Sequence, residues 1–363
     1  MTEELSHTSA LASRHTALGS GLEDWNGMGT AWTYNTDPND EHDAVREAAD
    51  MFDMSPLKKI LIRGPDAAAT LDHLTTRDMS KVTSGKAAYL CVLTEDGGIA
   101  DDAIVSNNGN DEWMIVHGSG DTFALLEASA KGRDVVIEFT DDLHDLSVQG
   151  PKSLEILNAN CDIDLSELAY FQHAPAKLFG HACRISRTGY SGERGYEIFA
   201  DAGVIGDIWD KLVEAGVMPC SFTALDKVRI EAGLLFFGYD MTDENTPWEV
   251  GLGFTVSNTK SDYRGKERVI AAKSNPAVNN VCLDINHSEM VAGGEKLLSD
   301  GKEVGIVNSP AFSHRLGKSL ALAHVEPSVA VGTKLRLAGD GIDTTAIVVS
   351  SPVYDPEKLR THS

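Results

Sequence analysis

The chain has 363 residues, enough for two or three domains with sizeable buried cores. Its formal net charge of −24 sets up a long-range field that repels phosphate backbones and anionic lipid surfaces. We therefore predict no nucleic-acid partner and no membrane partner.

The cysteines and the first residues favour a cytoplasmic location. Five cysteines, an odd number, occur without a CxxC pair or a Cys/His metal pattern, so we expect reduced thiols and no metal site. Residues 1–21 lack a basic stretch followed by an apolar run, so no signal peptide is predicted. No run of ~18 apolar residues occurs, which argues against a membrane-spanning helix.

An internal repeat is the first architectural feature along the chain. Residues 59–71, KILIRGPDAAATL, recur as residues 145–157, DLSVQGPKSLEIL. In both copies an alternating strand stops at a Gly-Pro pair, and an amphipathic helix follows with proline near its first turn, where the missing N–H is tolerated. The first half of the chain is expected to hold two related strand-turn-helix units.

The other elements of the first 240 residues mix strands and helices. Residues 87–93 and 99–105, joined by a turn with two glycines, predict a β-hairpin. Further strands are predicted at 113–117, 183–187 and 196–199, and helices at 122–130, 204–215 and 224–235. Mixed sheets covered by helices are the expected result.

From about residue 280 the pattern changes to short apolar runs separated by Gly, Asp and Ser. These runs cover 281–285, 304–307, 319–324, 334–337 and 344–349. Short strands without long helices predict a small β-barrel or a sandwich as the last domain.

Common catalytic and cofactor motifs are missing. The sequence has no GxGxxG loop, no GxxxxGK[ST] loop, no GxSxG and no HExxH. Nucleotide, flavin, hydrolase and metalloenzyme interpretations therefore lose their usual support.

Two strings place carboxylates where chemistry is possible. In GGIADD, residues 97–102, Asp101 and Asp102 begin a strand, and since side chains alternate between faces only one of them can point into a given cleft. A solvated hairpin end is an equally simple interpretation. In RTGYSGERGYE, residues 187–197, Glu197 lies within an apolar strand after a glycine-rich loop, so it is either paired structurally or open to a ligand with N–H donors.

These strings belong to an ordered set that also includes FDMSP at 52–56, QGP at 149–151 and TPWEVGL at 246–252. Over roughly residues 45–355 the chain resembles the folate-dependent aminomethyltransferase family, that of the glycine-cleavage T-protein and its demethylase relatives. The resemblance implies an α+β fold: a three-domain cloverleaf of two related mixed α/β units and a C-terminal β-barrel-like domain around a central folate channel. The domains would be 1–55 with 140–255, which binds folate, then 56–139, and last 275–363.

The resemblance also implies roles for individual residues. Asp102 would be the catalytic carboxylate beside the reacting folate nitrogens, and Glu197 would accept hydrogen bonds from the pterin. Tyr89, Tyr170 and Tyr190 would line the slot for the pterin and aminobenzoate rings, although each tyrosine alone would more often be a core residue. Tetrahydrofolate is the implied acceptor of the one-carbon group.

Two departures from the T-protein pattern change the expected substrate. Leu225 stands where the T-protein has an arginine, and Pro56-Leu57 replaces its His-Met pair. Residues 30–35, TAWTYN, are similar to the matching stretch of dimethylsulfoniopropionate demethylase. Trp32 and Tyr34 could form an aromatic wall for a sulfonium or quaternary ammonium donor, or could simply anchor the N-terminal segment.

The leading hypothesis is a tetrahydrofolate-dependent demethylase that moves a methyl group from a small onium, N-methyl or methoxy donor. One alternative is the aminomethyltransferase of glycine cleavage, which would need a lipoyl carrier protein as partner, and Leu225 counts against it. Another is a non-enzymatic folate-binding protein of iron–sulfur assembly, whose Lys-Gly-Cys-Tyr-x-Gly-Gln string is missing from this sequence.

Overall fold

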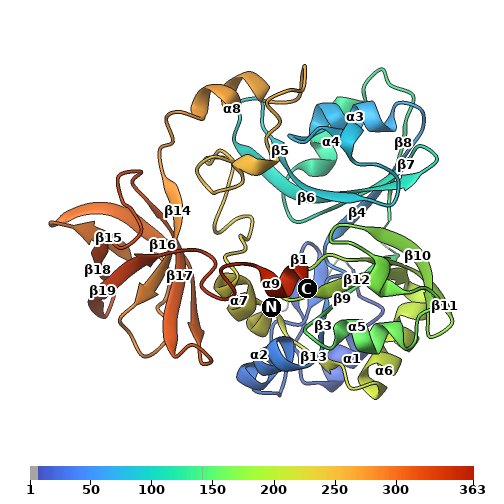
Figure 1. The fold of residues 1–363 in the computed structure, drawn as a ribbon, viewed down its shortest axis with the longest axis horizontal. Coiled ribbons are helices and arrows are strands. Elements are labelled where there is room, and N and C mark those ends of the chain that lie inside the picture. The colour runs from blue at the N-terminus through green and yellow to red at the C-terminus, as the bar shows by residue number, and fades with distance from the viewer. Residues whose placement is uncertain (1–6, 141) are drawn as a thin grey trace.

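The computed structural model describes residues 7–140 and 142–363, which form three bodies (Figure 1). Two of them are each built on an open sheet with covering helices, and the third is a closed β-barrel. A small hairpin of β1 (Glu23–Trp25) and β2 (Met28–Thr30) precedes the first sheet. This architecture confirms the predicted α+β fold, and closure of the last sheet decides for a barrel over a sandwich.

The first body is a six-stranded sheet in the order β10-β11-β12-β9-β3-β13. Its strands are β3 (Asp50–Asp53), β9 (Leu143–Gln149), β10 (His173–Leu178), β11 (His181–Ser186), β12 (Gly195–Asp201) and β13 (Met218–Pro219). One face packs on α5 (Ser153–Asn158) and α6 (Ala202–Glu214), through an apolar core that contains Leu146, Ile198 and Trp209. Helix α1 (Ala12–Ala17) lies beside this core.

The opposite face of this sheet is polar, because alternate residues of a strand point to opposite sides. Strand β9 places Asp145, Ser147 and Gln149 on this face, and its register with β12 adds Glu197 opposite Ser147. The register of β11 adds Ser186 opposite Glu197. All five side chains are buried.

The second body is an antiparallel sheet in the order β5-β6-β7-β4-β8. Its strands are β4 (Lys58–Arg63), β5 (Ala87–Leu93), β6 (Ile99–Gly109), β7 (Glu112–His117) and β8 (Val136–Phe139). Helices α3 (Ala67–Leu74) and α4 (Thr122–Ala130) cover one face through Leu71, Leu74 and Leu126. Met114 and Val116 on β7 pack against Phe199 of the first sheet.

The structure extends the sequence repeat and gives it a symmetry. Each counterpart lies 86 positions later, so that β4, Gly64 and α3 correspond to β9, Gly150 and α5. Both glycines have positive φ, at 126° and 104°, and an added Cβ would lie 2.5 Å or 2.7 Å from a carbonyl oxygen. The correspondence continues into η1 (Met79–Lys81) and η2 (Leu165–Glu167), which are capped by Asp78 and Asp164.

The two copies meet at equivalent positions. Lys86 and Gln172, which are counterparts, form an antiparallel β-bridge. Its two hydrogen bonds run from Ala87 N–H to the Phe171 carbonyl, at 2.8 Å, and from His173 N–H to the Gly85 carbonyl, at 3.0 Å. Exchanging the copies turns one bond into the other, so a local twofold axis passes through this bridge.

The third body is a closed barrel in the order β14-β17-β16-β15-β18-β19. Its strands are β14 (Asn279–Ile285), β15 (Lys296–Ser299), β16 (Lys302–Ser313), β17 (Lys318–Val325), β18 (Lys334–Gly339) and β19 (Ile342–Val349). Leu283, Leu297 and Leu337 lie in its interior. Strand β15 was not among the predicted runs because its sequence, KLLS, places two leucines next to each other and does not alternate.

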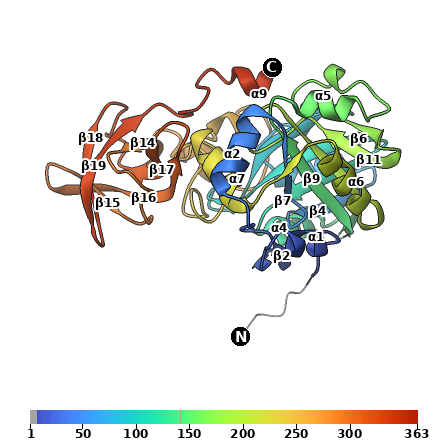
Figure 2. The ribbon, with the colours of Figure 1, turned by 90° about the horizontal axis from the view of Figure 1, so that it is seen from below.

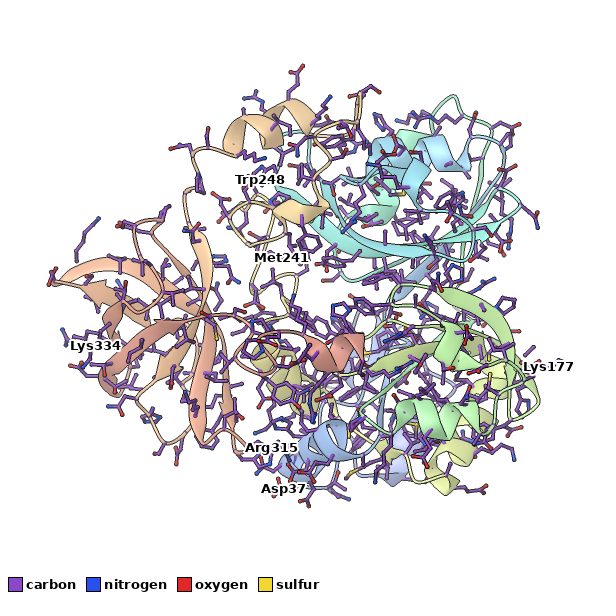
Figure 3. All side chains as sticks on the ribbon, viewed as in Figure 1. Asp37, Lys177, Met241, Trp248, Arg315 and Lys334 are labelled. Carbon is purple, nitrogen blue, oxygen red and sulfur yellow. The ribbon has the colours of Figure 1, made fainter. Side chains whose placement is uncertain are left out.

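The predicted helix at 224–235 is wrong at its end. Helix α7 spans Phe222–Glu231, and Gly233 follows with a φ of 65°, a left-handed conformation that ends helices. Leu234 and Leu235 therefore lie outside the helix. The connection to the barrel contains η3 (Gly253–Thr255) and α8 (Lys266–Ala272). Met241 and Trp248 lie in this connection, between the barrel and the second body (Figure 3).

A buried ion network joins the first body to the barrel. Helix α2 (Pro38–Glu47) lies beside α7 (Figure 2), and its Arg46 Nη2 donates to Glu231 Oε2 at 2.7 Å. Glu231 also accepts from Ser313 on β16, and His42 Nε2 lies 3.1 Å from it. Arg46 Nη1 donates to Glu193 at 3.1 Å. Burial opposes ionisation of Glu231, but the hydrogen bond with His42 and the charge of Arg46 lower its pKa to about 2.

Glu231→Leu should destabilise the protein by about 3 kcal/mol, because it leaves the buried Arg46 guanidinium with one carboxylate fewer. Urea unfolding at pH 7 measures this effect. Asp343→Asn is the matched control: its ion pair with Arg336 is exposed to solvent, so this substitution should change the stability far less than Glu231→Leu does. Equal effects of the two substitutions would contradict a structural role for the network.

Candidate active site

The neighbouring residues Asp101 and Asp102 on β6 direct their side chains to opposite sides of the sheet. Asp101 is fully buried and accepts a hydrogen bond from the Thr122 hydroxyl at 2.7 Å, and His117 Nδ1 lies 2.8 Å from the same oxygen. Its other oxygen accepts the Asp102 N–H. Asp101 therefore ties the hairpin to α4 and β7, whereas Asp102 points to the other side of the sheet.

Asp102 accepts a hydrogen bond from the Tyr89 hydroxyl on β5, with 2.8 Å between the oxygens. Burial and the nearby charge of Asp101 raise the pKa of Asp102 to about 7, and the Tyr89 hydrogen bond opposes this rise. A carboxyl group with a pKa near neutrality can release and take up a proton at physiological pH. The Asp102–Tyr89 pair is thus equipped for acid–base chemistry.

Tyr190 faces this pair from the first body. It lies in the glycine-rich loop between β11 and β12, and its hydroxyl donates to the Leu235 carbonyl at 2.5 Å. Burial raises the pKa of Tyr190, and among the charges that act on it is that of Asp102. The charge of Tyr190 in turn contributes to the raised pKa of Tyr89. The structure therefore brings together Asp102, Tyr89 and Tyr190.

Glu197 and Tyr170 form a second group on the polar face of the first sheet. Glu197 Oε2 accepts a hydrogen bond from Thr188, and Oε1 accepts none from the residues that the structure describes. Burial raises the pKa of Glu197. Tyr170 is 37% exposed and packs edge-on against Phe171 and His362. Burial and the charge of Glu197 raise the pKa of Tyr170, so the two side chains are neighbours.

Of the three proposed donor-pocket residues, two share a location. Leu225 on α7 belongs to an apolar cluster against which Trp32 and Tyr190 pack, and the Trp32 ring lies 5.4 Å from that of Phe222. Tyr34 lies elsewhere: it is 9% exposed, and its hydroxyl is 2.7 Å from His15 Nδ1. The structure therefore does not bring Trp32 and Tyr34 together.

Tyr34 is held in its position by a buried hydrogen-bond network. His15 lies between the Tyr34 hydroxyl and Asp53, whose Oδ2 is 2.8 Å from His15 Nε2. The His15 ring also packs edge-on against Trp209 at 5.2 Å. The hydrogen bond with His15 satisfies the buried Tyr34 hydroxyl within the first body. The residues that make this network lie far apart in the sequence, so the sequence around Tyr34 does not indicate it.

Sequence reasoning missed Thr188, the hydrogen-bond donor to Glu197, and Asp145, which shares the polar face with Glu197. Thr188 lies within the string that singled out Glu197. Asp145 is the first residue of the second repeat copy and corresponds to Lys59 in the first copy. A charged residue at this position of an alternating strand was the one sequence signal that could have indicated Asp145.

Family comparisons agree with this geometry. Residues 11–260 match the family described as the GCVT N-terminal domain, and residues 279–355 match the glycine cleavage T-protein C-terminal barrel domain. The chain belongs to the glycine-cleavage T-protein family. The family prediction and the prediction of an enzyme are confirmed, and folate dependence follows at the level of this family. The three predicted domain boundaries stay a prediction.

Relatives within the T-protein family carry different activities. The chain is 45% identical to a heme-dependent oxidative N-demethylase gamma subunit of Ectopseudomonas mendocina, over 97% of each chain. It is 36% identical to a trimethylamine-oxide aldolase of Ruegeria pomeroyi, over 90% of this chain but 44% of that longer protein. The glycine cleavage aminomethyltransferase T structure from Bartonella henselae superposes with a TM-score of 0.90 at 26% identity, over 97% of this chain and 99% of that one.

Two features are absent from the described residues, 7–140 and 142–363. None of their helices has the length and apolar character needed to cross a membrane. No group of three or more His, Cys, Asp or Glu side chains in this part of the chain could hold a metal ion.

Asp102→Asn should raise the thermal unfolding midpoint at pH 8 by a few degrees and leave it unchanged at pH 4. The reason is that the folded pKa, about 7, exceeds the unfolded value of about 4, so the stability present at low pH is lost as pH rises through 7. Differential scanning fluorimetry at both pH values measures this. Asp101→Asn, the control, should lower the midpoint at both, because it weakens the acceptor for Thr122 and His117.

Proposed function

We propose that this enzyme transfers a one-carbon unit from a small methylated amine donor to tetrahydrofolate, as part of a demethylation. The observation that carries the proposal is the Asp102 carboxyl group with a pKa of about 7, bonded to Tyr89 and facing Tyr190. A transferase that joins a carbon to a folate nitrogen needs a group that removes a proton from that nitrogen. Asp102 is suited to this task.

Glu197 supports the assignment of the pterin site. A pterin presents adjacent N–H donors that a carboxylate accepts in bidentate fashion, and Glu197 retains an oxygen that accepts no hydrogen bond from the described residues. The partly exposed ring of Tyr170 offers a flat surface beside it.

The relatives' activities favour an N-methyl carbon at the oxidation level of formaldehyde. One relative is named for oxidative N-demethylation and another for an aldolase reaction of trimethylamine oxide, and a methyl carbon removed by either chemistry leaves as an aldehyde. Condensation of formaldehyde with tetrahydrofolate forms two C–N bonds, releases one water and gives methylenetetrahydrofolate without a change in redox state. Asp102 would take the proton from the attacking nitrogen and return it to the departing hydroxyl group.

Oxidation of the donor would then belong to a separate protein. The relative at 45% identity is named as one subunit of a heme-dependent enzyme, and the chain aligns with 97% of it. We therefore propose an oxidising partner chain that delivers the carbon. A lipoyl carrier protein would be the partner only under the glycine-cleavage alternative.

Direct methyl transfer is the second candidate, because Trp32 lies beside Leu225 and Phe222 in an apolar cluster that suits an onium group. Such a donor loses a neutral leaving group and needs little acid catalysis. The product folate distinguishes the candidates: this route gives 5-methyltetrahydrofolate.

Mass spectrometry of the folate product tests the proposal. The enzyme is incubated with tetrahydrofolate and, separately, with ¹³C-formaldehyde, N-methylated amines, sulfonium and methoxy donors, and an aminomethyl-lipoyl carrier protein. We expect labelled methylenetetrahydrofolate to form from formaldehyde faster than in a protein-free control. 5-Methyltetrahydrofolate from a methylated donor would favour direct transfer, and release of ammonia from the carrier protein would restore glycine cleavage.

Substitutions should separate binding from turnover. Glu197→Ala should weaken tetrahydrofolate binding about tenfold or more, since pterin N–H groups lose their acceptor at ~1–3 kcal/mol. Asp102→Asn should lower turnover at least about a hundredfold with little effect on folate affinity. Titration calorimetry and steady-state rates measure the two effects. Wild-type turnover of Asp102→Asn would move the catalytic role elsewhere.

A further inference from the structure

Asp145 is a buried carboxyl group without a hydrogen-bond partner. Its side chain is fully buried on β9, and neither carboxyl oxygen has a partner among residues 7–140 and 142–363. Buried polar groups are nearly always paired, so each exception needs an explanation. Nothing in the packing of the first body requires a carboxyl group at this position.

The β-register places Asp145 on the same sheet face as Glu197. Asp145 pairs with Phe199, and Glu197 pairs with Ser147, so the two carboxyl groups are diagonal neighbours on adjacent strands. Long side chains in this relation are within reach of each other. Asp145 thus lies beside Glu197, the carboxylate to which we assign the pterin.

Three charged groups act on Asp145, and two of them are already engaged. Lys59 on β4 donates to the carbonyls of Ser55 and Leu57, each at 2.7 Å. Asp53 on β3 is bonded to His15, Ser9 and the Ser55 N–H. Burial, together with the charges of Glu197 and Asp53, raises the pKa of Asp145 well above its ordinary value, against the lowering effect of Lys59. The raised pKa favours the protonated form of Asp145, which has an O–H to donate.

We propose that Asp145 is a positioning residue for folate: it donates a hydrogen bond to Glu197 through one buried water, and so orients the Glu197 carboxylate toward the pterin. The inference rests on the proposed function. With the Thr188 hydroxyl on one side and the Asp145 O–H on the other, Glu197 stays the anion of the pair and presents an oxygen to the ligand.

This role gives Asp145 a signature that a structural residue would not have. A buried carboxyl group without a partner destabilises the fold, so a leucine of similar size should be neutral or stabilising. The same leucine cannot donate a hydrogen bond. Stability and folate affinity should therefore change in opposite directions.

The test uses the full chain, with 5-formyltetrahydrofolate as the probe, titration calorimetry for affinity and thermal unfolding for stability. At pH 7 we expect Asp145→Leu to melt no lower than the wild type yet to bind about tenfold more weakly. Asp145→Asn, which keeps a donor, should bind within about threefold of the wild type. In a Glu197→Gln background, Asp145→Leu should cause little further loss, because both substitutions remove the same interaction.

The pH profile gives a second test that does not depend on the folding of Asp145→Leu. Wild-type affinity should fall as the pH rises through the raised pKa of Asp145, where Asp145 loses its proton and becomes a like charge beside Glu197, whereas Asp145→Asn should not show this fall. Three results would overturn the inference but not the proposed function. These are wild-type affinity in Asp145→Leu, an equal loss of affinity from Asp145→Leu in the wild-type and Glu197→Gln backgrounds, and identical pH profiles for the wild type and Asp145→Asn. No folate binding by the unmodified protein would overturn the proposed function, and the inference with it.

Discussion

A buried arginine lies at the junction between the first body and the barrel. Arg46 bridges Glu231 and Glu193, and Glu231 also accepts a hydrogen bond from Ser313 of the barrel, so this ion network helps to fix the first body against the third. A second junction, an apolar cluster with Leu93, Met241 and Leu320, joins the second body to the barrel through the connecting segment. Asp102 and Tyr190 come from different bodies, and the two junctions add to the direct contacts between these bodies at Phe199 and at the Lys86–Gln172 bridge.

Buried ion networks of this kind contribute less to net stability than their attraction suggests, because each charge has lost its hydration. Their value here is positional. The Arg46 guanidinium has several donors in a fixed plane, and it meets Glu231, Glu193 and two backbone carbonyls at once. Because these hydrogen bonds are directional, they tolerate little displacement of the first body relative to the barrel. An apolar contact of similar area would allow the two bodies to shift against each other.

Sequence patterns predicted what depends on neighbours along the chain. The Gly-Pro turns, the 87–105 hairpin and the short strands of the last domain followed from alternation and turn residues, and alternation alone implied that Asp101 and Asp102 point apart. The fate of Tyr34 could not be read in this way, since it depends on His15, Asp53 and Trp209 meeting in space. For the same reason the proximity of Asp145 to Glu197 became visible only through the register of β9 with β12.

The bridge between Lys86 and Gln172 bears on how such a chain could arise. Two identical units related by a twofold axis would make this contact with each other, as in a homodimer. In a homodimer, however, both subunits have the same sequence, so equivalent positions near the twofold axis carry the same residue. Two equal charges at such positions would repel each other. Lys59 and Asp145 are counterparts that attract each other, since the charge of Lys59 lowers the pKa of Asp145. Joining the two units in one chain removes the requirement of identity, so one half could keep a cation while its twin acquired the acid that now lies diagonal to Glu197 on the sheet.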